Sequence, residues 1–378
     1  MEKLLCNGAE NKYWLSYICT NGSDTTNFEC FSKYYTQNQP VRIFRKVLGA
    51  WFMIVGTIGV FGNLYTLLSI PHAAKRNKFG LDRNFYTTTI FILHLCFIDF
   101  CHCVSFVWPT GLIYLLERWP FAPLGCSFLV ITGQVTVSAD MTAIALVSLT
   151  RCLNIMIPKK WDLICDKTTN LIMMMLSVWL LSIMSLFPYF FKSYGVEPGW
   201  DCEAGGCAFR WKYMINNNET VPSYIQDPEK ICDSQFDCKI SFMYLYFLIK
   251  YSFCILVCMM SYAVLLFKVH SSKKNLKGPE NKVTNSDDTE RRMSLTILML
   301  ITMNIVCLLP FLVYYVVGFE KWGTSRSFRA SIQFEMVEAL YVSQFALNFL
   351  VYVARSDQSR KAFVLYWQYI KSKLKINK

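Results

Sequence analysis

The sequence predicts an all-α integral membrane protein, a seven-transmembrane helix bundle followed by a short amphipathic eighth helix. Of the 378 residues, 54% are hydrophobic and 17% are charged, whereas a soluble domain usually has about a quarter charged residues. The hydrophobic residues gather in seven blocks, each long enough for the helix of about 20 residues that crosses a bilayer core. The net charge of +12 comes from basic residues spread between these blocks. Because they form no dense patch, nucleic-acid binding is not predicted.

The seven blocks divide the chain into an N-terminal segment at 1–43, a transmembrane domain at 44–355 and a tail at 356–378. The tail is basic and amphipathic, as expected of a helix that lies on a membrane surface. A long loop at 192–239 carries four cysteines and is expected to form a lid. The predicted spans are 44–70, 86–112, 124–156, 168–191, 240–269, 291–318 and 334–355. The third and seventh spans are more polar than the rest, which is typical of helices that face a bundle interior.

The charged residues between the spans predict the orientation in the membrane. The segments 71–85, 151–167, 268–292 and 355–378 hold 22 Lys and Arg, against 15 in the complementary segments. Cytoplasmic loops carry the excess of Lys and Arg, so the C-terminus is expected inside and the N-terminus outside. Glycosylation sequons begin at Asn21 and Asn218, both on the expected outer side. Eight cysteines map outside, and the other eight, within spans or inside, are expected to be thiols.

Landmark residues at family-like spacing make the chain resemble the rhodopsin-like, or class A, G protein-coupled receptors over all seven spans. Arg151 follows Cys126 by 25 residues, as in that family, and the seventh span carries Asn348-Phe-Leu-Val-Tyr352. The remaining landmarks are Gly62-Asn63, Asp99, Trp119, Trp179, Pro188, Tyr262 and Pro310. The resemblance implies a multi-pass receptor of the plasma membrane that transmits an extracellular ligand signal to a heterotrimeric G protein.

Arg151, Glu290, Tyr262 and Tyr352 are the switch residues that the resemblance implies. In the family, the arginine of span three holds the closed state through ionic contacts and then releases to receive the G protein. Here Thr150 precedes it, where the family usually has an acid. Glu290 is expected to supply the acid from span six. If both are instead solvated interfacial charges, no bridge forms, and an exposed pair contributes only about 0–1 kcal/mol. Raised basal activity is therefore expected.

Asp99 and Asp140 are the acids deepest in the predicted membrane region. A charge at the bilayer centre costs at least about 2.5–3.5 kcal/mol, so each acid needs a partner or a proton. The resemblance implies a sodium ion near Asp99, and Asp140 stands where the family commonly has a serine. Two carboxylates would bind a cation or share a proton, with Asn63 and Asn348 as neutral partners. A permanently protonated Asp140 is the alternative.

The ligand pocket is expected between spans three, five, six and seven. Amine receptors of this family have an aspartate where this chain has Gly133, so a biogenic amine is not expected and a peptide or lipid-like ligand is. Lys250 would suit an anionic group, although a snorkelling lysine or a structural pair with Glu338 is an equal interpretation. The pocket residues predicted by helical spacing are Gln134, Tyr246, Lys250, Phe311, Tyr315 and Glu338.

A disulfide from Cys126 to the long loop is implied by the family. Cys207 is the favoured partner, since Gly206-Cys-Ala-Phe209 resembles the corresponding stretch of melatonin-type and related insect orphan receptors. The pairing of the other outer cysteines cannot be read from the sequence.

Two other function classes remain open at this point. A receptor-like protein that binds without signalling is suggested by Thr150 and by Leu308, which replaces the usual tryptophan of span six. Intramembrane acids also suit a proton-coupled transporter, but no internal repeat supports one. The four histidines have no metal-ligand spacing and no catalytic constellation is visible, so neither an enzyme nor a metal site is predicted.

Overall fold

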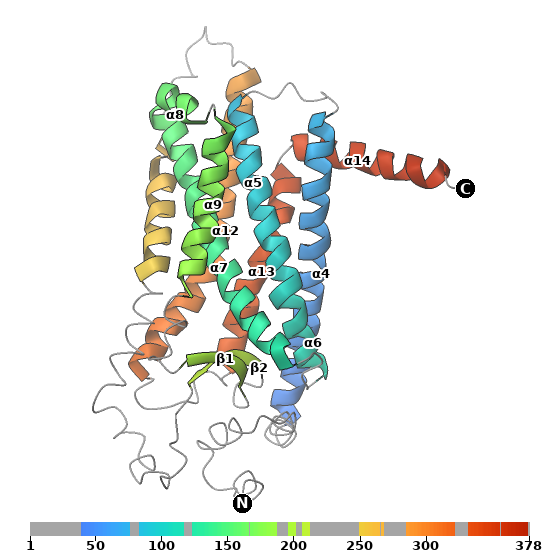
Figure 1. The fold of residues 1–378 in the computed structure, drawn as a ribbon, viewed down its shortest axis with the longest axis vertical. Helices are drawn as coiled ribbons and strands as arrows, with labels where there is room; N and C mark the ends of the chain where they lie inside the picture. Colours follow the sequence, from blue (N-terminus) through green and yellow to red (C-terminus); the bar gives the residue numbers. More distant parts are fainter. Residues whose placement is uncertain are drawn as a thin grey trace, which may run out of the picture.

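A computed structural model gives the fold as a bundle of long helices with one projecting helix (Figure 1). The structure describes residues 39–75, 83–116, 123–165, 167–186, 196–201, 206–211, 249–264, 266–267, 285–321, 332–355 and 357–376. Outside these residues lie Asn21, Asn218 and Tyr246 entirely, together with the side chains of Cys207, Glu290 and Tyr315.

Helices occupy all seven of the predicted spans. The elements are α4 (Gln39–Lys75), α5 (Arg83–His102), η2 (Cys103–Val107), α6 (Trp108–Leu116), α7 (Pro123–Met156), α8 (Pro158–Cys165), α9 (Thr168–Met184), a helix at Ile249–Val264, α12 (Asn285–Lys321), α13 (Ile332–Arg355) and α14 (Asp357–Ile376). Among the described residues, five spans are each long and apolar enough to cross a membrane on their own: α4, α5 to α6, α7, α12 and α13. The fourth span, α9, passes that test only together with α8, and the two helices meet at an angle of 87°. The described part of the fifth span is a shorter apolar helix.

The second span contains a short π-helix, η2, between α5 and α6. Pro109 lies just beyond it and has no N–H to donate to the carbonyl four residues earlier, at Ser105. A wider turn accommodates such a missing bond, and π-turns often lie at functional sites. The extra residue turns Phe106 onto α7, where its ring would lie 2.5 Å from a Cβ added at Gly133.

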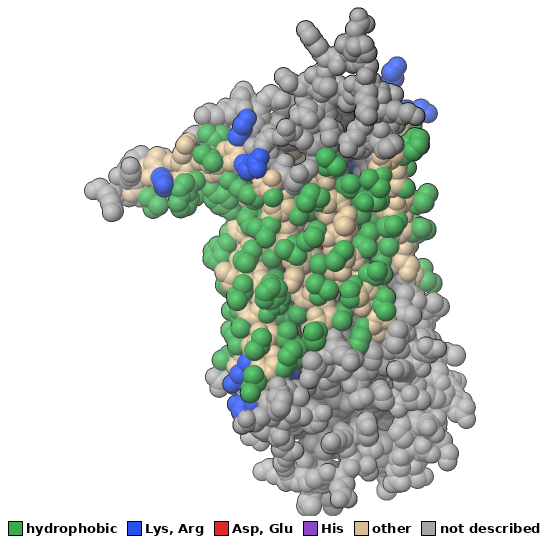
Figure 2. All heavy atoms as spheres, turned by 180° about the vertical axis from the view of Figure 1, so that it is seen from behind, with side chains coloured by type: hydrophobic (Ala, Val, Ile, Leu, Met, Phe, Trp, Pro, Cys, Tyr) green, Lys and Arg blue, Asp and Glu red, His purple; other side chains and the backbone are tan. Residues whose placement is uncertain are grey.

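The outer surface of the bundle is apolar between two charged ends. Figure 2 shows hydrophobic side chains over the middle of one face, with Lys and Arg at the two ends. Large exposed hydrophobic side chains include Phe61, Phe128, Leu180, Phe253 and Met260. A belt of this kind needs a hydrocarbon environment, so the bilayer that the sequence predicts accounts for it.

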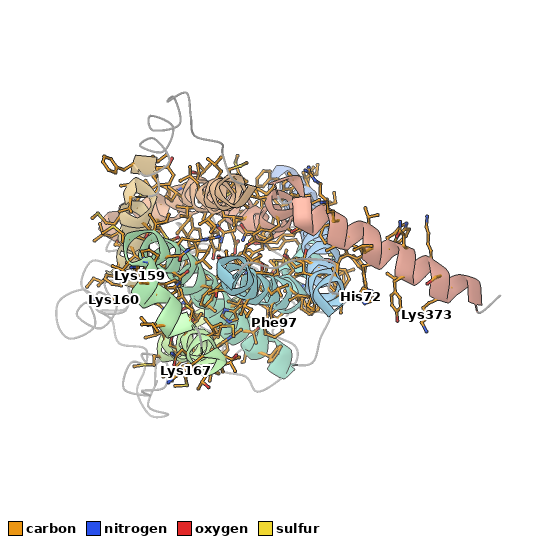
Figure 3. All side chains as sticks on the ribbon, turned by 90° about the horizontal axis from the view of Figure 1, so that it is seen from above. His72, Phe97, Lys159, Lys160, Lys167 and Lys373 are labelled. Atoms are coloured by element: carbon orange, nitrogen blue, oxygen red, sulfur yellow. The ribbon has the colours of Figure 1, made fainter. Side chains whose placement is uncertain are left out.

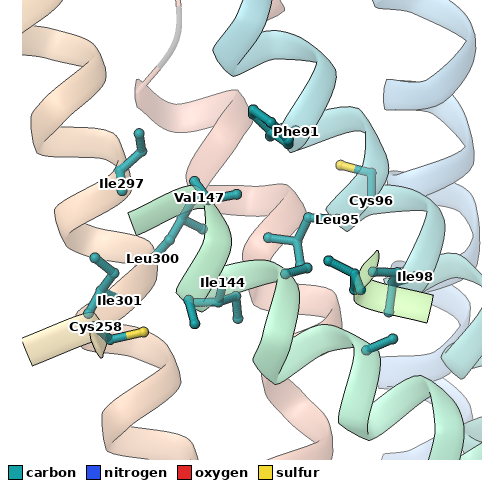
Figure 4. Packing of buried hydrophobic residues seen from close by; sticks show 14 of the residues in the cluster. Phe91, Leu95, Cys96, Ile98, Ile144, Val147, Cys258, Ile297, Leu300 and Ile301 are labelled. Atoms are coloured by element: carbon teal, nitrogen blue, oxygen red, sulfur yellow. The ribbon is translucent and has the colours of Figure 1, made fainter. Parts of the chain in front are cut away.

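Two hydrophobic clusters fill the interior. One includes Phe52, Leu129 and Val342 and lies toward the β-hairpin, hereafter the hairpin end. The other includes Leu95, Val147 and Ile301 and lies toward α14, hereafter the α14 end (Figure 4). Along α5, α7 and α13 the first cluster gives way to the second near residues 98–103, 139–141 and 346–351. The buried acids Asp99 and Asp140 lie at this junction.

A β-hairpin, which the sequence did not predict, lies within the long loop. Its strands β1 (Val196–Asp201) and β2 (Gly206–Trp211) are antiparallel, and Trp200 pairs with Cys207. Both strands contact α7. Cys126 of α7 is disulfide-bonded, and its pairing with Cys207 stays a prediction. The eight cysteines expected to be thiols are free: Cys96, Cys101, Cys103, Cys152, Cys165, Cys254, Cys258 and Cys307.

Helix α14 projects sideways from the end of the bundle, next to α4 (Figure 1). The view from above places His72 of α4 beside the middle of α14 (Figure 3). The Tyr65 hydroxyl donates to the Phe363 carbonyl at 2.7 Å, and the His72 ring lies 4.6 Å from the Tyr369 ring. Val364 and Trp367 stay exposed. These aromatic contacts attach α14 to α4 and leave an apolar face for a membrane surface.

Gly62 of α4 is required by the aromatic side chain of Phe349 on α13. A Cβ at Gly62 would lie 2.3 Å from Cδ1 of Phe349. We therefore expect Gly62→Ala to destabilise the bundle by about 1–3 kcal/mol through overpacking. The apparent unfolding midpoint of the purified chain measures this effect. The double variant Gly62→Ala/Phe349→Leu should recover part of the loss, and no recovery would mean that the contact is not its cause.

Candidate functional site

A buried polar cluster lies at the junction of the two hydrophobic clusters. It is built by α5, α7, α12 and α13, which bring together Asp99, Asp140, Asn304, Gln344 and Asn348. Both aspartates are 0% exposed, and their carboxyl groups face each other closely enough for a side-chain hydrogen bond. The structure thus brings together the two acids that lie 41 residues apart in the sequence.

Amide side chains hold the two carboxylates. Nδ2 of Asn348 donates to Oδ2 of Asp99 at 3.1 Å, and Nε2 of Gln344 donates to Oδ2 of Asp140 at 2.9 Å. Nδ2 of Asn304 reaches Oδ1 of Asn348 at 3.4 Å and links α12 to the cluster. The predicted ion site included Asn348 but missed Gln344 and Asn304. Gln344 precedes Asn348 by four residues, so its helical spacing was the available signal.

Asn63 lies near this cluster without bonding either carboxylate. It is 0% exposed, and its Nδ2 donates to the Phe345 carbonyl at 3.0 Å. Its role is therefore to join α4 to α13, which differs from the direct partnership with the acids that was expected. The reason is positional, because the Phe345 carbonyl lies closer to the α4 side chain than the acids on α5 and α7.

The unbonded atoms of the cluster suit a hard cation. Five buried oxygens have no hydrogen-bond partner within the described part of the chain: Oδ1 of Asp99, Asp140, Asn63 and Asn304, and Oε1 of Gln344. Every amide nitrogen named above is already donating. Hard cations take carboxylate and amide oxygens as ligands. The donor set therefore fits a small hard cation such as Na⁺ as well as it fits a shared proton.

His102 is a further buried polar residue that the sequence reasoning missed. It lies one turn beyond Asp99 on α5 and is 0% exposed. Its Nδ1 lies 2.7 Å from the Thr136 hydroxyl of α7, and its ring stacks 3.9 Å from the Phe345 ring. The imidazole thus ties the second, third and seventh spans together on the hairpin side of the acids.

The predicted switch residues lie at the α14 end. The Arg151 side chain is 2% exposed, which makes it one of the largest fully buried side chains. The Thr150 hydroxyl donates back to the Val147 carbonyl at 2.8 Å. Tyr352 is 1% exposed, whereas Tyr262 of the fifth span is part-buried. The side chain of Glu290 lies outside the described residues, so the Arg151–Glu290 bridge stays a prediction.

Lys250 is held by neutral groups inside the bundle. Its Nζ donates to the Ser138 hydroxyl of α7 and, at 3.3 Å, to the Leu181 carbonyl near the end of α9. These contacts correct the interpretation that Lys250 pairs with Glu338. Lys250 joins the third, fourth and fifth spans, whereas Glu338 belongs to a cluster on the first and seventh.

That second cluster lies at the hairpin end. Nε of Arg45 on α4 donates to Oε1 of Glu335 on α13 at 2.5 Å, and both side chains are buried. The guanidinium also lies 5.0 Å from the centre of the Tyr114 ring. Glu338, one turn along α13, interacts electrostatically with both Glu335 and Arg45. The predicted pocket residues Gln134 and Phe311 are part-buried on α7 and α12.

A small cavity lies between α7, the fifth-span helix and α12. It measures about 20 Å³ and is lined by apolar residues apart from Asn304. Its other lining residues are Met141, Ile144, Cys254, Ile255, Cys258, Ile301, Ile305 and Leu308. A volume of this size holds about one water-sized group, so it is no ligand pocket.

The helix bundle and its buried polar core define the class of protein. The profile of the 7 transmembrane receptor (rhodopsin family) matches residues 82–352. The chain therefore belongs to the rhodopsin family of seven-transmembrane receptors, which are G protein-coupled receptors and multi-pass membrane proteins. It has the squid rhodopsin fold, with a TM-score of 0.61 at 16% identity over 87% of both chains.

Similar sequences are also receptors. The chain is 24% identical over 346 residues to galanin receptor 2b of Danio rerio, covering 90% of this chain and 79% of that one. It is 24% identical over 157 residues to neuropeptide Y receptor type 6 of Mus musculus, covering 42% and 40%. It is 25% identical over 184 residues to the alpha-1A adrenergic receptor of Oryzias latipes, covering 48% and 33%.

Proposed function

We propose that this receptor lies in the plasma membrane with its N-terminus outside and transmits the binding of an extracellular peptide to a heterotrimeric G protein. The observation that carries the proposal is the buried polar network, in a chain of the rhodopsin family. That network joins Asp99 and Asp140 to Gln344, Asn348 and Asn304, and it lies between the buried Arg45–Glu335 pair at the hairpin end and the buried Tyr352 at the α14 end. Helices α5, α7, α12 and α13 all contribute to it, so a change of packing at one end alters contacts at the other.

A peptide ligand is favoured over a biogenic amine. Two of the similar receptors are named for galanin and neuropeptide Y. An aspartate at Gly133 would collide with the Phe106 ring, since even a Cβ there would lie 2.5 Å from it. This contact leaves no room for the acid that amine receptors carry at that place.

Replacing Arg151 tests whether the receptor couples to a G protein. Because its buried guanidinium lies at the α14 end, we expect it to contribute to the surface that receives the G protein. The chain is expressed in cells, and ligand-free coupling is measured across G protein subtypes at matched surface expression. Basal coupling of the wild type should fall to background in Arg151→Ala. The Arg360→Ala variant, which changes an exposed arginine of α14, controls for loss of basic charge at that end.

The same assay tests the alternatives. Basal coupling that Arg151→Ala leaves unchanged would contradict the proposed switch. Glu290→Ala should raise basal coupling if Glu290 restrains Arg151, and an unchanged basal level would count against that bridge. An N-terminal epitope tag should be stained in unpermeabilised cells, and staining only after permeabilisation would overturn the proposed orientation.

We also propose that the Asp99–Asp140 pair holds a small hard cation, with Na⁺ as the expected ion, in the resting receptor. The five unbonded oxygens, one on each carboxylate and three on amide side chains, support this proposal. Such an ion would supply positive charge between two carboxylates that otherwise repel each other. Asp99 and Asp140 would hold it, and Gln344 and Asn348 would orient them.

A further inference from the structure

We infer that Glu338, Tyr341 and Phe311 form a subsite at the hairpin end for a cationic group of the ligand, a guanidinium or ammonium. The inference rests on the proposed receptor function and names the ligand chemistry of its outer site. It differs from the amine site excluded at Gly133, because the acid comes from α13 and not from α7.

Glu338 has more negative charge around it than Arg45 can balance. The Nε of Arg45 binds Glu335 at 2.5 Å, so the guanidinium is already engaged by one of two neighbouring carboxylates. Glu338 interacts electrostatically with both of these groups. Within the described residues, Glu338 itself accepts no hydrogen bond. The three groups together carry a net charge of −1, and a carboxylate inside the bundle needs a cation or a proton.

The Glu338 side chain is incompletely covered by the described residues. It is part-buried, while its neighbour Glu335 is 3% exposed. Lys250, the other charged pocket residue, does not neutralise it, since the Lys250 contacts are to Ser138 and the Leu181 carbonyl. The charge of Glu338 is therefore balanced by a proton, by a residue outside the described part or by a ligand, and the next observation favours a ligand.

An aromatic pair lies one turn below Glu338. Tyr341 follows Glu338 by three residues on α13 and interacts electrostatically with it. The Tyr341 ring stacks on the Phe311 ring of α12 at 5.0 Å and 21°. The Tyr341 hydroxyl is buried and has no hydrogen-bond partner within the described chain. A carboxylate next to aromatic rings and an unbonded hydroxyl can bind a planar or tetrahedral cation. The carboxylate supplies charge, the rings supply a cation–π contact and the hydroxyl supplies a hydrogen bond.

The test uses three probes of one shape and different charge: benzamidinium, benzamide and benzoate. Each is titrated at constant NaCl concentration and ionic strength against the full chain in nanodiscs, with binding read by saturation-transfer NMR and by the apparent unfolding midpoint. The wild type should bind benzamidinium at least about tenfold more tightly than benzamide and should not bind benzoate.

Two variants of Glu338 separate charge from shape. Glu338→Gln should lower the benzamidinium affinity to that of benzamide, whereas Glu338→Asp keeps the charge and should retain most of the preference. Tyr341→Phe should weaken benzamidinium binding by a smaller factor through loss of the hydroxyl. Because the three-probe comparison in the wild type needs no variant, a variant that fails to fold leaves the test valid.

Equal affinity of the wild type for benzamidinium and benzamide would overturn the subsite, as would wild-type benzamidinium binding by Glu338→Gln. Arg151-dependent basal coupling is measured separately on the same chain. Coupling without charge discrimination would leave the receptor function standing and remove the subsite. Glu338-dependent discrimination without coupling would keep the subsite and remove the signalling function.

Discussion

Arg45→Met is expected to lower the stability of the receptor by about 3–5 kcal/mol, because it leaves Glu335 buried without its guanidinium. Arg45 and Glu335 are each 3% exposed, and they join α4 to α13 across 290 residues of sequence. The variant also places the Glu335 and Glu338 carboxylates together without the cation between them. In the purified chain the apparent unfolding midpoint should fall by roughly 5–10 °C.

The rescue variant identifies the cause of that loss. In Arg45→Met/Glu335→Leu no charge is left buried in the pair, and replacing a buried ion pair by apolar residues is often neutral. The double variant should therefore be more stable than Arg45→Met alone. Lys46→Met, at the adjacent exposed position, should change the midpoint little. If the double variant were as unstable as the sum of the single ones, the ion pair would not be what joins these helices.

Asp140→Asn is expected to have an effect on stability whose sign depends on sodium. Without Na⁺, two facing carboxylates in the bundle interior repel each other and lack solvation. Removing one charge there should stabilise the chain by about 2.5–3.5 kcal/mol, the least cost of a charge at that depth. With Na⁺ the wild type gains binding free energy that the variant lacks, so the difference should shrink or reverse.

The measurement compares unfolding midpoints of wild type and Asp140→Asn in NaCl and in choline chloride at equal ionic strength, at several pH values. A sodium-dependent difference supports the cation. A difference that does not depend on sodium but grows as pH rises supports a proton shared by Asp99 and Asp140. The asparagine mimics the protonated acid at every pH, so the variant is the more stable one only where the wild type has lost its proton. A difference that depends on neither would contradict both proposals. Thr132→Ala, which removes an α7 hydroxyl bonded to carbonyls of its own helix, controls for a general change in helix packing.

The same buried network explains why the family's switch positions can differ in this chain. Leu308 stands where the family has tryptophan, and Asn304 one turn before it hydrogen-bonds Asn348. Phe349 stands where the family has proline and packs against Gly62. A polar link between α12 and α13 and an aromatic contact between α13 and α4 thus replace two of the usual landmarks.

The sequence by itself determined the fold class. Hydrophobic blocks of membrane length can be satisfied only as helices, since no water is present to bond a free backbone group. The same pattern located α7 within one residue at its start, the α13 end at residue 355 and the eight free cysteines. The identities of Asp99 and Asp140 as the deep acids were also readable, because an acid inside an apolar block is conspicuous.

Only the tertiary structure decided which of these polar groups meet. Asn63 and Gln344 were both polar residues on inward faces, yet Gln344 bonds Asp140 while Asn63 bonds the backbone at Phe345. Lys250 and Glu338 were candidates for one pair, and the structure gives them separate partners. Helical periodicity fixes the face on which a side chain lies, but its partner depends on the rotation and depth of the neighbouring helices. Those are set by the packing of the whole bundle, which no local pattern in the chain records.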